Sequence, residues 1–368
     1  MRVLIVGGTW TIKDGMASSI IKKMDKDIQK TYPSIYVRTY NGGTYDELAR
    51  IIEQTPHYNY VFWFANVEDN TLAKIRNVKD YAPKCMLITS KRNDNQKYDF
   101  EELLQRALSV KANLCFEFSK VEKKLFNFRV FDPLGCVWYD GTDIHEAIVK
   151  CFNRLEYLNS VTRKPSIHNE STFEVTFNEN DKKFLEFVKE SANTFHALMG
   201  LPSNVDRFVG NASMRFKEPT RCMNGFPAIR KDDMILISRR NVDKTGISEK
   251  DFVPCFLNND DNVEYFGDNK PSVDSPVQVR LFKALPNIDY ILHGHVYIKD
   301  APMTNRAIPC GAIEESTEIL SNIDTNTDFL TLNLKGHGCL ILANASKLDK
   351  MKDIEFVVRP VPELMEPR

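Results

Sequence analysis

The amino-acid sequence predicts an α/β protein of two domains, the first built on a doubly wound parallel sheet. The chain has 368 residues, more than one domain usually holds. Through residues 1–158, short β-rich apolar runs alternate with amphipathic helical segments. This alternation is typical of a parallel sheet with helices on both faces. Residues 159–172 are polar and aperiodic, so we expect a linker there and a second domain over residues 173–368.

The strands of the first domain are predicted where apolar runs end in glycine or in polar residues. Such runs, including a closing hairpin, occupy residues 3–6, 35–39, 60–65, 85–89, 113–117, 126–131 and 136–139. Helical spacing is found at residues 17–30, after Thr44, and at 70–77, 99–109 and 143–157. The architecture resembles flavodoxin-like domains, a likeness that concerns the fold and supplies no function.

The carboxyl end of the first strand is a candidate ligand site. Gly7, Gly8 and Thr9 follow the first apolar run, where a glycine turn can hold a phosphate at the next helix N-terminus. The pattern is neither Gly-x-Gly-x-x-Gly nor a P-loop with its lysine. The alternative interpretation is a tight strand-to-helix turn without a ligand.

Composition limits the class of protein. Hydrophobic residues make up 42% and charged residues 27%, with a formal net charge of −1. No overall basic field therefore indicates a nucleic-acid partner. No apolar run approaches the roughly 18 residues of a membrane span, and the N-terminal run is typical of a strand rather than a signal peptide. Eight cysteines without a Cys-x-x-Cys pair favour reduced thiols and a cytoplasmic protein.

The C-terminal half contains further predicted elements. Residues 178–200 form a long amphipathic helix with Asp181 as the expected cap, and Ser248 is the expected cap of a short helical turn. Ser272 is expected to cap a helix that begins at Asp274. Strands are expected after the turn at Gly210 and at residues 234–238, 339–343 and 354–358.

Two histidines at the end of an apolar run indicate a metal site. His293 and His295 are two residues apart, so on a strand their side chains point to the same face. Imidazole is a common ligand of zinc and similar cations. His337 and Asp274 offer a third imidazole and a carboxylate, which would nearly complete a metal shell. The alternative interpretation is a polar strand end with hydrogen-bonded histidines.

The order of short motifs over residues 182–350 resembles the class II aldolase/adducin-like family. The matching motifs are Gly210-Asn211-Ala212-Ser213, Val242-Asp243-Lys244, residues 248–253, residues 270–274, Pro286-Asn287-Ile288, His293-Gly294-His295, Ile308-Pro309-Cys310 and His337-Gly338. This resemblance implies an α/β domain with a central, mainly antiparallel sheet. It also implies a homotetramer with sites at subunit interfaces and a small-molecule substrate.

The same resemblance implies roles for individual residues. His293, His295 and His337 are similar to the family's three metal ligands, usually of zinc. Asp274 takes the position of an acidic residue that is a glutamate acid/base in aldolases and an aspartate in pentulose-phosphate epimerases. The implied reaction is carbon–carbon cleavage or epimerisation of a sugar phosphate or related aldol through a metal-stabilised enediolate.

The phosphate pocket matches the family only in part. Gly210, Asn211 and Ser272 fit it, whereas Ser238 and Arg239 stand where the family has a Thr-Pro-Ser-Gly type of loop. Arginine binds phosphate well, but it is also common at a solvated strand end.

Other departures leave two further hypotheses open. The segment between His295 and Ile308 is short, and after Lys350 we expect the helical tail of several family members to be short or absent. These losses favour an adducin-like, non-catalytic binding or scaffold protein. A bifunctional enzyme, whose N-terminal domain handles a nucleotide or glycosyl group, is the third hypothesis. The choice between zinc and another divalent ion also stays open.

Overall fold

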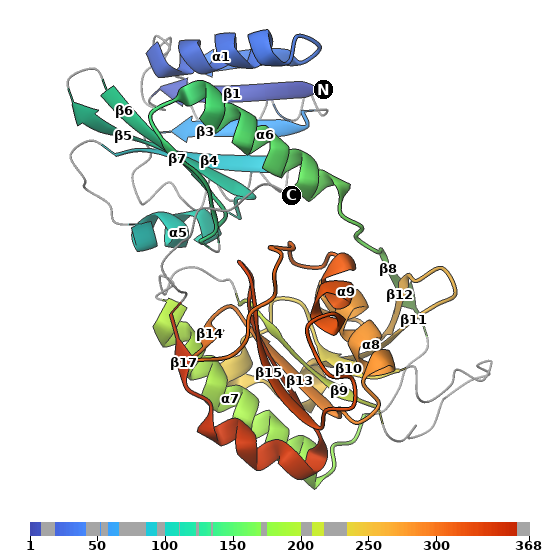
Figure 1. Cartoon of the computed structure of the whole chain (residues 1–368). Coiled ribbons are helices and arrows are strands. Elements are labelled where there is room, and N and C mark those ends of the chain that lie inside the picture. The colour runs from blue at the N-terminus through green and yellow to red at the C-terminus, as the bar shows by residue number, and fades with distance from the viewer. Residues whose placement is uncertain are drawn as a thin grey trace. The chain divides into compact units, whose positions relative to one another are not determined.

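The structure is a computed structural model. It describes residues 1–8, 19–41, 52, 58–65, 86–93, 100–109, 111–122, 125–133, 135–170, 175–199, 208–216 and 234–358. The chain divides into two compact units, the first within Met1–Asn159 and the second over Ser160–Pro360 (Figure 1). The predicted helix after Thr44, the predicted helix at 70–77 and the candidate ligand residue Thr9 lie outside the described residues.

The first unit contains the predicted parallel sheet. Its described strands are β1 Arg2–Gly8, β2 Tyr36–Asn41, β3 Tyr60–Ala65, β4 Met86–Asn93, β5 Leu114–Glu122, β6 Leu125–Phe131 and β7 Val137–Gly141. Their order is β2-β1-β3-β4-β5-β6-β7, parallel through β5 and antiparallel in the β6–β7 hairpin. The order 2-1-3-4-5 is the flavodoxin-like one. The sequence-based fold prediction is confirmed.

Helices cover both faces of this sheet. The described helices are α1 Ser19–Thr31, α5 Phe100–Ser109 and α6 Ile144–Ser160. Phe152 of α6 stacks on Phe62 of β3, and Phe62 lies in register with Ile88 of β4 and Leu114 of β5. α5 packs instead with Cys115, which follows Leu114 on β5 and points to the opposite face, so α5 and α6 lie on opposite sides of the sheet. Figure 1 shows α6 crossing the sheet.

The second unit is built on a mainly antiparallel sheet. Its described strands are β8 Ser166–Asn169, β9 Asn211–Arg215, β10 Ile235–Ser238, β11 Phe252–Leu257, β12 Val263–Phe266, β13 Tyr290–Gly294, β15 Phe329–Leu334 and β16 Gly338–Ala343. The order is β15-β16-β13-β9-β10-β11-β12-β8. Among these strands only β8 and β12 pair in parallel, and β8 comes from the stretch predicted as a linker.

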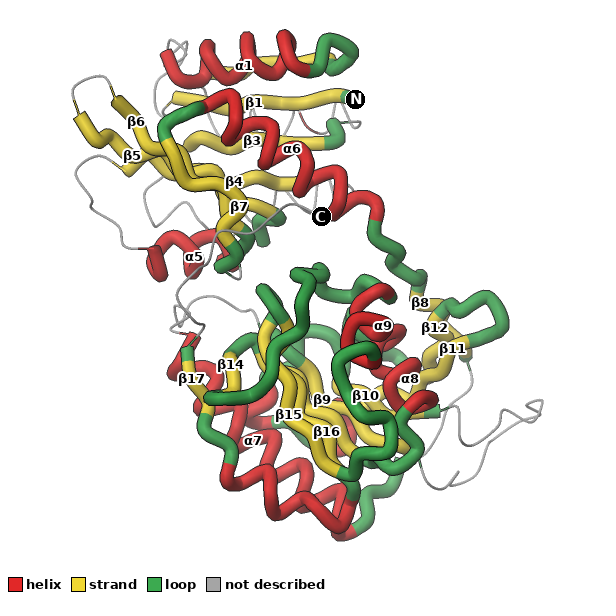
Figure 2. Tube along the Cα trace, viewed as in Figure 1, coloured by secondary structure: helices red, strands yellow, loops and turns green. Residues whose placement is uncertain are grey.

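Helices lie on both sides of the second sheet as well (Figure 2). The α-helices are α7 Glu179–Met199, α8 Ser275–Ala284 and α9 Glu314–Leu320. Phe184 of α7 contacts Tyr290, and α8 residues share a buried cluster with Ile291. Because Tyr290 and Ile291 are neighbours on β13, α7 and α8 cover opposite faces. His293 comes two residues after Ile291 on β13, so its side chain points to the same face of the sheet, the one that α8 covers.

Short 3-10 turns and a small ribbon complete the second unit. They are η3 Lys244–Gly246, η4 Glu249–Asp251, η5 Ala345–Asp353 and the pair β14 Tyr297–Ile298 with β17 Phe356–Val357. Ser248 caps η4 through a capping box with Asp251, as predicted. The cap predicted at Asp181 is wrong, because Asn178 Oδ1 accepts from the backbone N–H groups of Asn180 and Asp181. The Asp181 carboxylate in turn accepts from the Asn178 backbone N–H.

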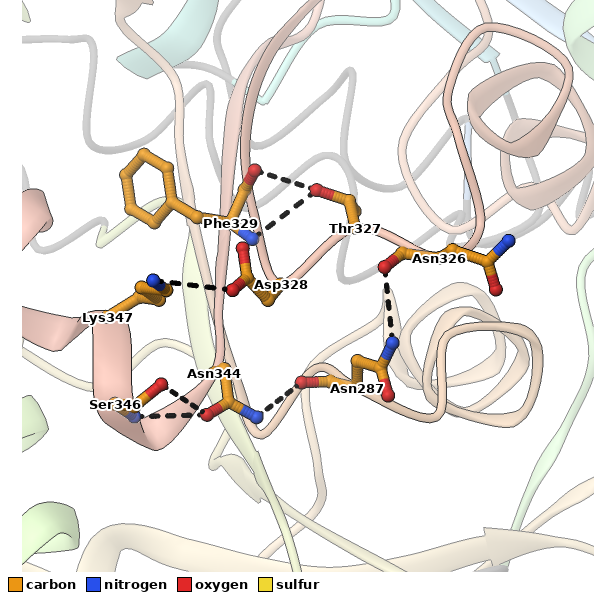
Figure 3. A network of polar contacts seen from close by, with 8 residues as sticks. All are labelled: Asn287, Asn326, Thr327, Asp328, Phe329, Asn344, Ser346 and Lys347. Carbon is orange, nitrogen blue, oxygen red and sulfur yellow. Dashed lines mark hydrogen bonds and ion pairs between the residues drawn. The ribbon is translucent and has the colours of Figure 1, made fainter.

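A polar network fixes the ends of the central strands (Figure 3). Asn344, which follows β16, donates to the carbonyl of Asn287 before β13, at 2.7 Å. Asn287 in turn donates to the carbonyl of Asn326 before β15, at 3.2 Å. The starts of β13 and β15 are thereby joined to the end of β16, which holds the register on which the site at their opposite ends depends.

Candidate metal centre

Three histidines converge at one end of the central strands. His293 lies in β13, His295 follows it, and His337 lies in the turn between β15 and β16. Their ring centroids are 5.0 Å apart for His293–His295, 4.6 Å for His293–His337 and 5.1 Å for His295–His337. One ligand atom from each lies within 4.8 Å of the others. The structure therefore brings together the three side chains that the sequence selects.

Two glycines let the chain approach β13 closely enough to form this cluster. β16 pairs with β13 in the register Gly294↔Cys339, and β9 pairs with it in the register His293↔Asn211. Gly338 has φ +140°, and a Cβ there would overlap the carbonyl oxygen of Gly294. Gly210 has φ +78°, and its Cβ would overlap the carbonyl oxygen of His293. Both positions require glycine, because side chains strongly disfavour these dihedrals and the space is filled by backbone.

Hydrogen bonds orient two of the rings. Nδ1 of His293 lies 2.9 Å from the carbonyl oxygen of Cys339, and Nδ1 of His337 lies 2.5 Å from Oε1 of Glu315. In both rings Nε2 is therefore the nitrogen aimed at the cluster. Among the residues that the structure describes, these two Nε2 atoms are buried without a hydrogen-bond partner. Buried orphan nitrogens backed by carbonyl or carboxylate acceptors fit a divalent cation, and three imidazoles leave one coordination position open.

The protonation of the rings suits ligation. Burial, with His337 nearby, lowers the pKa of His293 to about 4, so this ring is neutral and its nitrogen lone pair is available. Burial also opposes charge on His337, but the Glu315 carboxylate outweighs it and raises the pKa of His337 to about 9. Burial raises the pKa of Glu315 as well, so the pair shares one proton on the Nδ1 side. A cation on Nε2 would take the place of the other ring proton.

Asp274 is the buried carboxylate beside the histidines. It precedes the first residue of α8, is 4% exposed, and accepts a hydrogen bond from Asn211 Nδ2 on Oδ2 at 2.8 Å. The Cys310 thiol donates to its other oxygen at 3.0 Å. The prediction that Ser272 caps this helix is wrong. The N-cap position belongs to Asp274, and the Ser272 hydroxyl accepts a long bond from Asp274 N because the chain turns before the helix begins.

The predicted phosphate-pocket residues lie in neighbouring segments. Gly210 precedes β9 and Asn211 is its first residue, and Ser238 Oγ accepts a bond from the adjacent Ala212 N at 3.1 Å. Ser272 N donates to the carbonyl of Ser238 at 3.2 Å. Arg239 forms a 2.7 Å ion pair with Asp251. The structure thus gives the guanidinium a carboxylate partner of its own.

The N-terminal candidate residues occupy the end of β1. Gly7 pairs with Asn41 of β2 and Phe64 of β3, and Gly8 pairs with Ala65 of β3. The order of strands reverses at β1, which has β2 on one side and β3 on the other. In open α/β sheets such a reversal is where ligands bind.

Sequence reasoning assigned no role to Lys244, Cys310 or Glu315. Lys244 is 4% exposed and donates to the carbonyls of Val209 and Val242 at 3.2 and 3.4 Å. Burial lowers the pKa of its ammonium to about 8, against the opposing effect of Asp243 and Asp274. Lys244 and Cys310 were visible as members of motifs, but no local signal distinguishes Glu315 from its neighbour Glu314.

A family match agrees with this geometry. Residues 190–309 match the family model described as Class II Aldolase and Adducin N-terminal domain. At the level of the family, this match supports a class II aldolase-like function for residues 190–309. Class II aldolases generally depend on a divalent metal, and the three histidines form a possible metal-binding group. No helix among the described residues is long and apolar enough to cross a membrane.

Similar solved structures fall into two groups. Two resemble the chain at 13% identity: the DNA/pantothenate metabolism flavoprotein from Streptococcus pneumoniae and the C-terminal domain of the coenzyme A biosynthesis bifunctional protein CoaBC. They cover 44% and 43% of this chain and 99% and 95% of their own, with TM-scores of 0.34 and 0.31. An aldolase II superfamily protein from Pseudomonas syringae shows 13% identity, 49% and 72% coverage and a TM-score of 0.32. Among curated proteins, none shows significant similarity.

Proposed function

We propose that the chain is a metal-dependent carbon–carbon lyase or epimerase acting on a sugar phosphate or related aldol. The observation that carries the proposal is the convergence of three imidazoles, two of them almost fully buried, beside the buried carboxylate of Asp274. His293, His295 and His337 would hold the cation, with zinc as the first choice because nitrogen ligands suit it. When bound, such a cation supplies Lewis-acid polarisation of a substrate carbonyl and stabilises negative charge on its oxygen.

Asp274 is the group that we assign to proton transfer. Asn211 holds one carboxylate oxygen, and a carboxylate oxygen of Asp274 lies within 4.8 Å of a ring nitrogen of His337. A carboxylate placed in this way can remove a proton from a substrate hydroxyl and return it after the carbon–carbon bond has broken or re-formed.

Substrate binding is proposed for the turn at Gly210 and Asn211 together with Ser238 and Ser272. This segment supplies hydroxyl and backbone groups at the edge of the cluster. Arg239 is a weaker candidate for phosphate, because Asp251 already accepts from its guanidinium. We also propose, by family resemblance, a cytoplasmic homotetramer with a small-molecule substrate.

The test is turnover by the full-length protein loaded with Zn²⁺. A panel of ketose phosphates and aldols would be followed by NMR, with cleavage seen as aldehyde release and epimerisation as a new sugar spectrum. We expect turnover of one member, lost in both His293→Ala and Asp274→Asn. A metal-loaded wild type that turns over none of the panel but binds a protein partner would instead favour the adducin-like scaffold.

A second candidate function concerns the first unit. The end of β1 at Gly7 and Gly8 lies where the strand order reverses, which favours a nucleotide or phosphorylated ligand there. The full chain would be titrated calorimetrically with mono- and dinucleotides, in parallel with Gly8→Val. Binding by the wild type that the variant loses would support a bifunctional enzyme. Heat release that is equal in both proteins would contradict this assignment.

A further inference from the structure

The thiol of Cys310 lies against Asp274 from a separate loop. The loop connects β14 to α9, and Cys310 is partly buried there. Gly311, with φ +75°, lets the loop approach the carbonyl of Val273 so closely that a Cβ would lie 2.9 Å from its oxygen. This approach brings Cys310 to the residue that follows Val273, which is Asp274. The position of the sulfur is therefore set by backbone packing and not by the thiol alone.

The thiol is the second of two donors that hold the Asp274 carboxylate. Asn211 Nδ2 donates to Oδ2 at 2.8 Å, and Cys310 Sγ donates to Oδ1 at 3.0 Å. The two donors come from different segments, since Asn211 begins β9 and Cys310 lies in the loop before α9. A carboxylate oxygen has two acceptor positions, so each oxygen can still accept one more bond. The group is therefore fixed in one orientation and can still take up a proton.

The contacts of the sulfur point to a role through Asp274. Its ligand atom lies within 4.8 Å of those of Asp274 and His337, but the group that contains His293 and His295 does not include it. A thiol that donates to a carboxylate keeps its proton, because its removal would place two negative charges side by side. Asp274 thus stays the ionised acceptor that proton transfer requires.

We propose that Cys310 is a positioning residue, whose thiol holds Oδ1 of Asp274 so that the carboxylate keeps one orientation beside His337. The proposal rests on the proposed function, in which Asp274 accepts a proton from the substrate. No bond to sulfur forms or breaks, and the thiol proton stays on sulfur throughout. Cys310 acts on the reaction only through the carboxylate that it holds.

Two variants at this position test the role through turnover. Cys310→Ala has no donor, whereas Cys310→Ser keeps one on a slightly shorter side chain. With the panel substrate that the Zn²⁺-loaded wild type turns over, Cys310→Ala should lower kcat by about 10- to 100-fold, with KM and zinc content unchanged. Cys310→Ser should recover most of this loss, which a side chain that only fills space would not do. Cys136→Ala, at a cysteine of the first unit, is the control.

Thiol reactivity tests the contact itself without turnover. Iodoacetamide reacts with the thiolate, and a carboxylate at 3.0 Å disfavours that form. At one fixed pH, Cys310 should therefore be alkylated about 10-fold more slowly in the full-length wild type than in Asp274→Asn. Mass spectrometry of the modified peptides measures both rates. The peptide that contains Cys136 is the internal control and should react equally in the two proteins.

The outcomes separate this proposal from the proposed function. Equal alkylation of Cys310 in the wild type and Asp274→Asn would overturn the proposal whatever the turnover. A wild type that turns over its substrate no faster than Cys310→Ala, or a Cys310→Ser that recovers nothing, would overturn it and leave the proposed function standing. A wild type that turns over none of the panel would overturn the proposed function and, with it, the positioning role.

Discussion

Glu315 Oε1 lies 2.5 Å from Nδ1 of His337, and both side chains are almost fully buried. Helix α9 supplies the carboxylate, and the β15–β16 turn supplies the ring. The contact fixes which nitrogen of His337 faces the other histidines. A carboxylate behind an imidazole also makes the ring a stronger ligand. The pair thus links the helix layer to the candidate metal centre.

Glu315→Gln should weaken Zn²⁺ binding by about 10- to 100-fold, because an amide orients the ring but does not carry the negative charge. Glu314→Gln is the matched control, since Glu314 accepts instead from the backbone of Thr162. Competition with a chromophoric chelator measures both affinities. Equal affinities in Glu315→Gln and Glu314→Gln would show that the Glu315–His337 contact does not act on a metal ion.

Asp274→Asn should separate metal binding from catalysis. The amide keeps the shape of the side chain but cannot accept a proton, so we expect turnover to fall by about 10²- to 10⁴-fold with metal content unchanged. Asp268→Asn, at an exposed carboxylate in the same connection, is the control. Elemental analysis and the substrate assay would be run on the same samples. Loss of the metal in Asp274→Asn would show instead that Asp274 is a ligand.

Gly338→Ala should destabilise the second unit. The residue has φ +140°, and a Cβ would overlap the carbonyl oxygen of Gly294. We expect the free energy of unfolding to fall by at least about 2 kcal/mol, because the dihedral is strained and β16 must move away from β13. At Gly246 a Cβ meets open space, so Gly246→Ala should change the free energy of unfolding by less than about 0.5 kcal/mol. Urea unfolding measures both, and equal effects would contradict the close approach.

Lys244 should make stability depend on pH in an alkaline window. Its pKa is lowered by burial from 10.5 to about 8, although Asp243 and Asp274 oppose the shift. Between these values the unfolded chain binds the proton that the folded chain has lost, so stability rises with pH there. The gain is complete above 10.5 and absent below about 8, and it amounts to about 3 kcal/mol.

The measurement compares the wild type with Lys244→Met, which keeps the length of the side chain. Below the window Lys244→Met should have the higher free energy of unfolding, because it carries no buried charge. This advantage should shrink as pH rises through the window, because the buried Lys244 of the wild type loses its proton there. Lys250→Met, at an exposed lysine on η4, is the control. A difference between wild type and Lys244→Met that stays constant with pH would contradict this account.

The sequence predicted the strands well where burial determines the pattern. The run at residues 60–65 coincides with β3, and the run predicted at 234–238 begins one residue before β10. Caps were less predictable. Asp181 and Ser272 are good capping types, but Asn178 and Asp274 occupy the cap positions, because the helix start is set by where packing on the sheet begins. β8 carries little apolar signal, since it is an edge strand of four residues.

The candidate site was predictable only in part for a related reason. His293 lies in β13 and His295 directly follows the strand, so their shared face could be predicted from the two-residue spacing alone. The positions of Glu315, Lys244 and Cys310 depend on long-range packing that no local spacing records. Arg239 was predicted either to bind a phosphate or to lie at a solvated strand end. Its pairing with Asp251 could not be predicted without the fold.

The most direct test of the account is the metal content of the purified full-length protein. Elemental analysis would cover the wild type, His293→Ala, His337→Ala and, as control, His196→Ala on the exposed side of α7. We predict about one equivalent of zinc or another transition metal in the wild type and the control. Both site variants should lose it. A wild type without metal, even after incubation with excess Zn²⁺, would contradict the metal-dependent activity and favour a binding protein.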